Sequence, residues 1–380
     1  MGFMSIRMWI QGARPKTLPL GLSPVLIGIA ASWRWASLGD LDECPPGMGR
    51  LMTHWPYPYE WKGCGLAMRW FCVVAMLCIV VAVGLQITVN YLNDYADGMR
   101  GADAARTSDN AGPQRLVASG VNPKQVMVAA SIAALTACVA GLAVVIITEC
   151  WWFIALGLLC LLAAWGYTNG KHPYGYQGFG EAASFVFFGP VPVLGTQIAL
   201  CNTVTVMGVI GGIIAGLFSV GVMMVNNLRD AQADASHGKR TLIVRIGVPQ
   251  GRRWYCRAIG LATVLTAVCA MPSSVYLWIL DQLVALPAEV DAKCECSEYG
   301  INCPTWGTTD WLSLLLSVAA LAGIVLCVVL VVRSKNAVRQ EQWRQALPLC
   351  SMSSLAAACA FVGNALQAST LGGLPFVWLG

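Results

Sequence analysis

Two short segments of the sequence carry carboxylates and amides at helical spacing. Residues 89–97 read Val-Asn-Tyr-Leu-Asn-Asp-Tyr-Ala-Asp, and residues 225–234 read Val-Asn-Asn-Leu-Arg-Asp-Ala-Gln-Ala-Asp. Side chains three or four residues apart lie on one face of a helix. Mg²⁺ in proteins is commonly bound by one or two carboxylates together with phosphate oxygens and water. The two segments therefore indicate a site for Mg²⁺ and a diphosphate group.

Each segment follows a long apolar run, so both sets of acids are expected at helix ends near a membrane border. Asp and Asn at helix ends often serve only as caps, but two matching clusters on one side of a membrane favour a shared site. Asp103 belongs to the first cluster because Gly98 and Gly101 allow the chain to fold back before it. The candidate metal ligands are Asn93, Asp94, Asp97, Asp103, Asp230 and Asp234.

Cationic residues surround the acidic clusters. Arg115 follows the first cluster, Arg229 and Lys239 flank the second, and Lys171 lies in a third polar segment. Arginine offers two parallel hydrogen bonds to phosphate oxygens, and lysine offers a mobile point charge. The bias of membrane proteins toward positive cytoplasmic loops would also place these residues here. We expect the four to contact a diphosphate.

The composition is that of a membrane protein. Hydrophobic residues make up 57% of the 380 residues, charged residues only 11%, and the mean hydropathy is +0.63. A membrane-spanning helix needs about 20 mostly apolar residues, and spans in lipid are helical because every backbone group must find an internal partner. We expect an all-α, polytopic bundle of about nine transmembrane helices forming one domain over residues 1–380. The apolar runs are 15–33, 67–90, 124–147, 151–168, 181–200, 204–226, 257–285, 310–332 and 347–370.

The charge distribution predicts the orientation. With the N-terminus in the cytoplasm, most of the 24 lysines and arginines fall in cytoplasmic segments. Both acidic clusters then face the cytoplasm, and the C-terminus lies outside the cell. We expect a multi-pass protein of the plasma membrane. The net charge of +5 reflects this topology and phosphate binding, and no basic, aromatic-rich domain predicts nucleic-acid binding.

Two extracytoplasmic segments look like insertions. Residues 34–66 and 286–309 are rich in Pro, Gly and Trp and contain five cysteines, which the outer face allows to form disulfides. They lie on the side away from the expected chemistry. They are either tolerated surface insertions or a contact for another envelope protein.

Longer phrases around the clusters carry a family resemblance. These are Ala-Arg-Pro-Lys-Thr-Leu-Pro at 13–19, Asn-Asp-Tyr-Ala-Asp at 93–97, Pro-Tyr-Gly-Tyr at 173–176 and Asn-Asn-Leu-Arg-Asp at 226–230. Together they resemble the UbiA superfamily of intramembrane prenyltransferases over nearly the whole chain, the two outer segments excepted. The first and third phrases resemble the branch of that superfamily that acts in menaquinone biosynthesis.

The resemblance implies a fold and a reaction. It implies a UbiA-type helical bundle that transfers a polyprenyl chain from its diphosphate to 1,4-dihydroxy-2-naphthoate, with loss of CO₂ and diphosphate, to give demethylmenaquinone. It implies Mg²⁺ held by the two aspartate motifs. It also implies catalytic roles toward the diphosphate for Arg115, Lys171 and Arg229. The substrate-binding residues that it implies are Asn90, Tyr174, Glu181 and Lys239.

Other functions remain open at this point. Another transferase of the superfamily would act on 4-hydroxybenzoate, haem or a chlorophyll precursor. A cation-coupled transporter would also use intramembrane acids, but such sites lie near the bilayer midplane. A membrane scaffold would explain the outer segments but not the paired aspartates.

Overall fold

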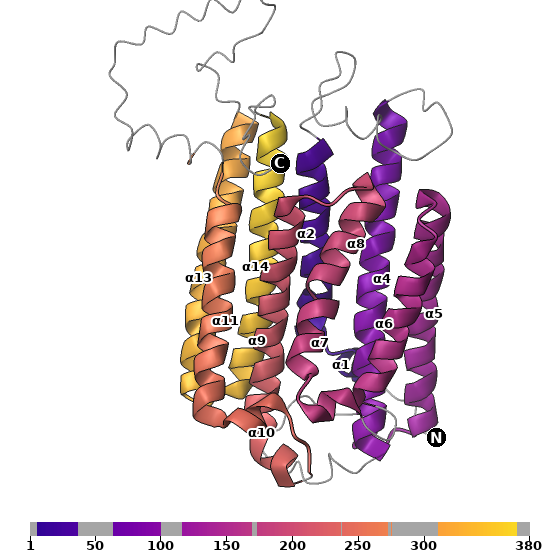
Figure 1. Ribbon diagram of the computed structural model, residues 1–380, viewed down its shortest axis with the longest axis vertical. Coiled ribbons are helices and arrows are strands. Elements are labelled where there is room, and N and C mark those ends of the chain that lie inside the picture. Colours follow the sequence, from indigo (N-terminus) through magenta and orange to yellow (C-terminus); the bar gives the residue numbers. More distant parts are fainter. Residues whose placement is uncertain are drawn as a thin grey trace, which may run out of the picture.

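The structure is a computed structural model that describes residues 6–36, 64–99, 116–168, 173–236, 238–272, 275 and 311–370. Within these ranges all regular secondary structure is helical, and the helices stand side by side along the long axis (Figure 1). The main helices are α1 (Ile6–Gly12), α2 (Leu18–Ala36), α4 (Cys64–Met99), α5 (Pro123–Thr148), α6 (Trp152–Thr168), α7 (Gly180–Phe187), α8 (Pro190–Cys201), α9 (Val206–Ser236), α10 (Leu242–Ile246), α11 (Val248–Cys269), α13 (Trp311–Arg339) and α14 (Trp343–Thr370). Two 3₁₀ turns, η1 (Pro15–Thr17) and η2 (Tyr174–Gln177), lie beside α1 and α7. The expected all-α bundle is confirmed.

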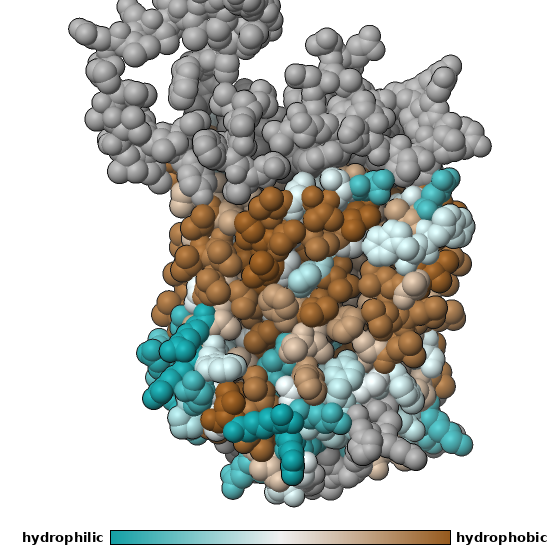
Figure 2. Space-filling view, in the orientation of Figure 1, coloured by the Kyte–Doolittle hydropathy of each residue, from teal (hydrophilic) through white to brown (hydrophobic). Residues whose placement is uncertain are grey.

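The described helices make this a multi-pass membrane protein. Figure 2 shows apolar side chains over the middle of the visible face and polar ones gathered at its lower end. A further apolar helix, Trp152–Tyr167, is shorter than a typical span. The total of nine spans stays a prediction. The segments that are long and apolar enough to cross a membrane are Arg69–Met99, Pro123–Thr148, Gly180–Cys201, Val206–Ser236, Trp311–Arg339 and Trp343–Gln367.

The expected fifth run, 181–200, forms two helices instead of one. Pro190 has no N–H to continue the hydrogen bonds of α7, so α8 starts afresh there. Gly189 packs against α9 so closely that a Cβ atom would lie 2.6 Å from the Gly212 carbonyl oxygen. The break therefore brings this helix pair directly onto α9.

The seventh run also differs from expectation. Its helix, α11, begins at Val248 and not near residue 257. Gly247, at φ 84°, ends the preceding turn, and the helix has a proline in its first turn. Arginines in the first part of α11 lower its hydropathy, which is why the apolar pattern missed this start.

The largest cluster of buried hydrophobic residues includes Phe218, Tyr255 and Ile259. It lies among helices α2, α9, α11, α13 and α14. Buried polar groups join the helices within this cluster. The Tyr255 and Ser334 hydroxyls lie 2.6 Å apart, and Ser334 donates to the Ala346 carbonyl at 3.0 Å. Such bonds satisfy polar groups where lipid offers no partner. The other helices, α4 to α8, pack beside this core and surround a cavity.

Candidate active site

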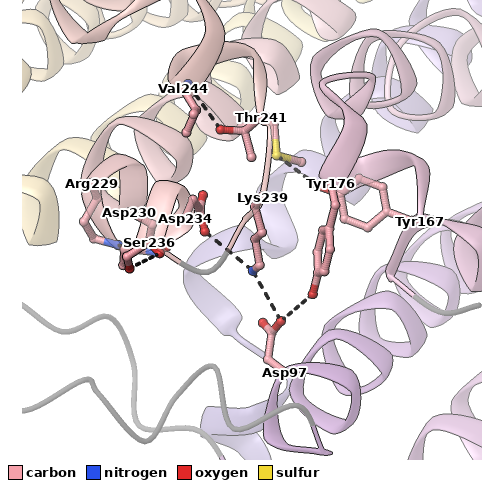
Figure 3. Close-up of polar contacts among 12 residues, drawn as sticks. Asp97, Tyr167, Tyr176, Arg229, Asp230, Asp234, Ser236, Lys239, Thr241 and Val244 are labelled. Carbon is pink, nitrogen blue, oxygen red and sulfur yellow. Dashed lines mark hydrogen bonds and ion pairs between the residues drawn. The ribbon is translucent and has the colours of Figure 1, made fainter. Parts of the chain in front are cut away.

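The acids of the two predicted clusters come together across one lysine. Asp97 lies near the end of α4, Asp234 near the end of α9, and Lys239 in the segment that follows α9 (Figure 3). The Lys239 Nζ lies 3.8 Å from Asp97 Oδ1 and 3.5 Å from Asp234 Oδ1. Both acids are only 8% exposed. Helices far apart in the sequence thus present carboxylates to one point at the same end of the bundle.

Tyr176 is a member of this centre that the sequence analysis missed. Its hydroxyl donates to Asp97 Oδ1 at 3.1 Å, and its ring lies 4.4 Å from the Lys239 Nζ. The Arg240 N–H donates to the Tyr176 carbonyl at 2.9 Å, which joins the segment after α9 to η2. The phrase Pro-Tyr-Gly-Tyr was the available signal, but sequence alone did not tell which tyrosine faces the acids.

Two glycines shape the segments that carry these side chains. Gly238 adopts φ 72°, a left-handed conformation that favours glycine, and there the chain turns back so that the Lys239 N–H donates to the Asp234 carbonyl at 2.8 Å. Gly175 sits against Tyr167, whose carbonyl oxygen would lie 2.7 Å from an added Cβ atom. Together they bring Lys239 and Tyr176 to the acids.

Asp230 and Arg229 form a separate pair on α9. The Arg229 Nε donates to Asp230 Oδ1 at 2.8 Å, and an Nη donates to Asp230 Oδ2 at 2.7 Å. Both side chains are mostly buried, 12% and 20% exposed. The guanidinium fork is directed at its neighbouring carboxylate, so a diphosphate or metal at this position would have to share these groups.

Asp94 has a different geometry from the one expected of a metal ligand. Its carboxylate is 1% exposed and accepts hydrogen bonds from the backbone N–H groups of Leu116 at 2.9 Å and Val117 at 3.1 Å. The neighbouring Asn93 lies on another face of α4 and lines the cavity. These contacts give Asp94 a structural role, because they anchor the chain ahead of α5. Its role as a metal ligand stays a prediction.

Asn90 also makes a structural contact. Its side-chain amide is buried and donates to the Ala13 carbonyl at 2.8 Å, and it lies 3.4 Å from Thr17 Oγ1. It thereby fixes the turn between α1 and α2 to α4. It also lines the cavity, as do Asn93 and, from α9, Asn226. A contact of Asn90 with substrate remains a prediction.

Glu181 begins α7 as a buried carboxylate, 6% exposed. Its Oε1 accepts a hydrogen bond from Asn227 Nδ2 at 2.8 Å, whereas its buried Oε2 has no hydrogen-bond partner among the described residues. Asn227, which the sequence analysis passed over, thus joins the second acidic segment to α7. Burying a carboxylate oxygen without a hydrogen-bond partner costs free energy. A ligand that donates a hydrogen bond to Oε2 would recover that cost.

Tyr174 lines the cavity together with Tyr167. The Tyr174 hydroxyl donates to the Ala163 carbonyl at 2.6 Å, and the two rings meet edge to face with centroids 5.6 Å apart. Burial raises the pKa of the Tyr174 hydroxyl, so it stays a donor at neutral pH. The pair forms an aromatic wall on the α6 side.

The cavity has a volume of about 500 Å³ and is bordered by α2 and by α4 to α9. Most of its lining is apolar, contributed by residues such as Leu85, Leu161 and Phe188. The amides of Asn93 and Asn226 line it one helical turn before Asp97 and Asp230. The cavity therefore leads toward the acids.

Three predicted site residues, Asp103, Arg115 and Lys171, lie outside the described residues. So does most of each outer segment, 34–66 and 286–309, and with them the predicted contact with an envelope protein. Their roles remain predictions.

Comparison with known proteins supplies the family. Residues 64–292 match the model of the UbiA prenyltransferase family. The chain belongs to the UbiA prenyltransferase family. This confirms the resemblance drawn from the motifs and makes the protein a prenyltransferase by membership.

Two curated relatives carry the same name. A 1,4-dihydroxy-2-naphthoate octaprenyltransferase of Mycobacterium tuberculosis (strain ATCC 25618 / H37Rv) is 39% identical, over 76% of this chain and 85% of its own. The protein of that name from Escherichia coli (strain K12) is 32% identical, over 73% and 81%. Among solved structures, a UbiA homologue from Aeropyrum pernix K1 is 12% identical with a TM-score of 0.47, over 93% of this chain and 98% of its own.

Proposed function

We propose that this protein transfers a polyprenyl group from polyprenyl diphosphate to 1,4-dihydroxy-2-naphthoate, releasing diphosphate and CO₂. The names of the relatives at 39% and 32% identity support this choice of acceptor. The observation that carries this proposal is that Asp97 and Asp234 converge on Lys239 close to an apolar cavity lined by Asn93 and Asn226. The charged centre suits the diphosphate head group, and the apolar cavity suits the long prenyl tail.

The acids suit Mg²⁺ that is shared with a substrate. The described residues contain no group of three or more acidic, histidine or cysteine side chains that would enclose a metal alone. One lysine nitrogen lies within 4 Å of a carboxylate from each motif, so Asp97 and Asp234 are close enough to hold one divalent cation together with a bound diphosphate. Mg²⁺ is often bound in this way. We propose Asp97 and Asp234 as its ligands, with Asn93, Asp103 and Asp230 near it.

The chain's own residues would prepare the departure of diphosphate. Tyr176 and Lys239 hold the Asp97 carboxylate, which fixes its orientation before substrate binds. Lys239, with Arg115, Lys171 and Arg229, would offset the negative charge that grows on the leaving group. When bound, Mg²⁺ would supply the same electrostatic stabilisation as a Lewis acid.

The cavity would hold the prenyl tail and exclude water from the allylic cation that forms as the C–O bond breaks. Tyr167 and Tyr174 line that cavity, and aromatic rings can stabilise a cation over their faces. A ring carbon of the naphthoate then forms the new C–C bond. The carboxylate leaves as CO₂ and its bonding electron pair stays with the ring, so the direct product is the quinol, demethylmenaquinol. After release, dissolved oxygen takes two electrons from the quinol to give demethylmenaquinone.

Glu181 would orient the acceptor. Its Oε2 is buried without a hydrogen-bond partner among the described residues, and the next turn of α7 places Ser184 in the cavity wall. A ring hydroxyl could donate to this oxygen, which would raise the electron density of the ring toward the prenyl carbon. Asn227, holding the other oxygen, fixes the carboxylate.

The orientation completes the proposal. We propose that the ends of α4 and α9 face the cytoplasm, where diphosphates are made, that the C-terminus lies outside, and that the membrane is the plasma membrane. The acids lie at the lower end of the bundle in Figure 1, where polar side chains gather in Figure 2.

The test is transfer activity of the purified protein in detergent. Octaprenyl diphosphate and Mg²⁺ are supplied with either 1,4-dihydroxy-2-naphthoate or 4-hydroxybenzoate, and products are identified by mass spectrometry. We expect demethylmenaquinone and Mg²⁺-dependent release of CO₂ only with the naphthoate. Prenylation of 4-hydroxybenzoate alone would keep the family activity and reject the proposed acceptor.

A bulky residue at position 195 is expected to discriminate against long donors. Gly195 lines the cavity, and an added Cβ atom there meets nothing within 4 Å. Gly195→Leu would therefore fill space that the tail needs while favouring helix α8. We expect the ratio of kcat/KM for octaprenyl over geranyl diphosphate to fall by about tenfold, as one or two kcal/mol of lost contact predicts.

A matched control adds similar bulk outside the cavity. Leu261 is 51% exposed on α11, so Leu261→Phe should leave the ratio unchanged. An unchanged ratio in Gly195→Leu would mean that the tail lies elsewhere.

A further inference from the structure

Two cations lie on the outside of the bundle, on the neighbouring helices α11 and α13. Arg257 is exposed on α11, and Lys335 is half-buried on α13. Hydrophilic side chains gather over the lower part of these helices, directly below apolar ones (Figures 1 and 2). This face is far from the cavity, which is bordered by α2 and by α4 to α9. Its charge therefore calls for an explanation apart from prenyl transfer.

The part of α11 beyond Arg257 faces lipid. Leu261, Val264 and Val268 follow Arg257 at helical spacing, and all three side chains are exposed. Trp254 is exposed about one turn before Arg257, and tryptophan is enriched where a membrane meets water. Arg257 thus lies at the level where acyl chains give way to lipid head groups.

Lys335 is directed back toward this level. Arg252, early on α11, pairs with Glu341, just after α13, so α13 ends beside the start of α11. Side chains on a helix lean toward its N-terminus, which for Lys335 is the apolar middle of the bundle. Its Nζ lies against Gly260, where an added Cβ atom would be 3.1 Å from it. Gly260 follows Arg257 by three residues, or about 4.5 Å along the helix axis.

No carboxylate offsets these two charges within the described part of the chain. Neither α11 nor α13 has an Asp or Glu in its sequence. Glu341 is already paired with Arg252, and neither Arg257 nor Lys335 is in an ion pair with a described residue. A cation beside apolar surface is costly unless an anion meets it there. The face therefore offers a place for an anionic group.

We propose that Arg257 and Lys335 bind the phosphate of an anionic phospholipid, and that Gly260 leaves the space in which the ammonium sits. Arginine offers two parallel hydrogen bonds to phosphate oxygens, and lysine a point charge. Basic sites between membrane-spanning helices are suited to such head groups. The acyl chains lie along Leu261 and Val264, which favours a lipid over a soluble phosphate. This proposal does not depend on the proposed function.

Lipid binding is measured by native mass spectrometry of the full chain in detergent. Phosphatidylglycerol and phosphatidylcholine with the same acyl chains are titrated separately. We expect the wild type to bind the first phosphatidylglycerol about tenfold or more tightly than phosphatidylcholine. Arg257→Gln and Lys335→Gln are each expected to weaken phosphatidylglycerol binding about fivefold. Binding of phosphatidylcholine should not change.

Two variants separate a built site from general positive charge. Lys124 is an exposed cation in the first turn of α5, at the same end of the bundle (Figure 1). Lys124→Gln should leave the lipid preference unchanged. Gly260→Leu keeps both cations but fills the place of the ammonium, which can move aside because it ends a flexible chain. Leucine also favours a helix, and we expect phosphatidylglycerol binding to weaken roughly threefold to fivefold.

Four results would overturn the proposal. Equal losses in Lys124→Gln and Arg257→Gln would show that only overall charge matters. Unchanged binding in folded Arg257→Gln and Lys335→Gln would remove both residues from lipid binding. Inorganic phosphate that displaces phosphatidylglycerol at equal concentration would assign the pair to a soluble anion. A dimer that Arg257→Gln dissociates would assign this face to a second copy of the chain.

Discussion

Asp97→Asn is expected to lower kcat/KM for prenyl transfer by about 10³-fold. The Asp97 carboxylate is 8% exposed, accepts the Tyr176 hydroxyl and faces the Lys239 ammonium. Asparagine keeps the shape of the side chain but removes the negative charge from a poorly solvated site, where charges interact most strongly. A cation placed between Asp97 and Asp234 would then have a carboxylate on one side only.

The measurement is initial rate against both Mg²⁺ and donor concentration. In Asp97→Asn we expect the Mg²⁺ concentration for half-maximal rate to rise and the limiting rate to fall. Glu341→Gln is the matched control, because Glu341 is an exposed acid whose ion pair with Arg252 lies away from the cavity. Surface pairs of this kind contribute little, and the control should retain full activity. More than one tenth of wild-type activity in Asp97→Asn would exclude a metal-binding role for this residue.

The spacing of the acids predicted which side chains of α4 lie near one another, because helix geometry is local. Asn93 and Asp97 are four residues apart on one face of α4, and Asn93 does line the cavity. The same geometry places Asp94 about 100° away around the helix, toward Leu116 and Val117. Spacing alone could not separate the two neighbours, because Asp94 is itself three residues from Asp97, or about 60° around the helix.

The contacts that join the two motifs could not be predicted from spacing. Lys239 lies near both Asp97 and Asp234 because Gly238 reverses the chain after α9 and the Arg240 N–H reaches Tyr176. These are contacts between loops, and their geometry depends on where α4, α9 and η2 stand in the bundle. The choice between Tyr174 and Tyr176 depended on the same tertiary arrangement.

The helices, too, were predictable from the sequence only in part. The apolar runs predicted the bundle because lipid demands long helices. The break at Gly189–Pro190 had a readable signal, since proline interrupts a helix, yet the run of apolar residues masked it.

Lys239→Gln is expected to have two effects of opposite direction. Its ammonium lies 3.8 Å from one motif carboxylate and 3.5 Å from the other, which offsets their mutual repulsion when no metal is bound. Removal of this charge leaves the acids more negative, so the protein without substrate should bind Mn²⁺, used as a probe for Mg²⁺, about tenfold more tightly. The diphosphate would lose a cation, so kcat/KM for the donor should fall about 10²-fold.

Charge and position can be separated with two controls. Lys239→Arg keeps the positive charge beside both acids, so its Mn²⁺ affinity should stay near that of the wild type. Arg253 is an exposed cation on α11, and Arg253→Gln should change neither quantity. Mn²⁺ binding is followed by electron paramagnetic resonance and donor kinetics by product formation. Weaker Mn²⁺ binding in Lys239→Gln would show that this lysine holds the acids in place for the metal and does not compete with it. An unchanged kcat/KM for the donor would show that Lys239 does not contact the diphosphate.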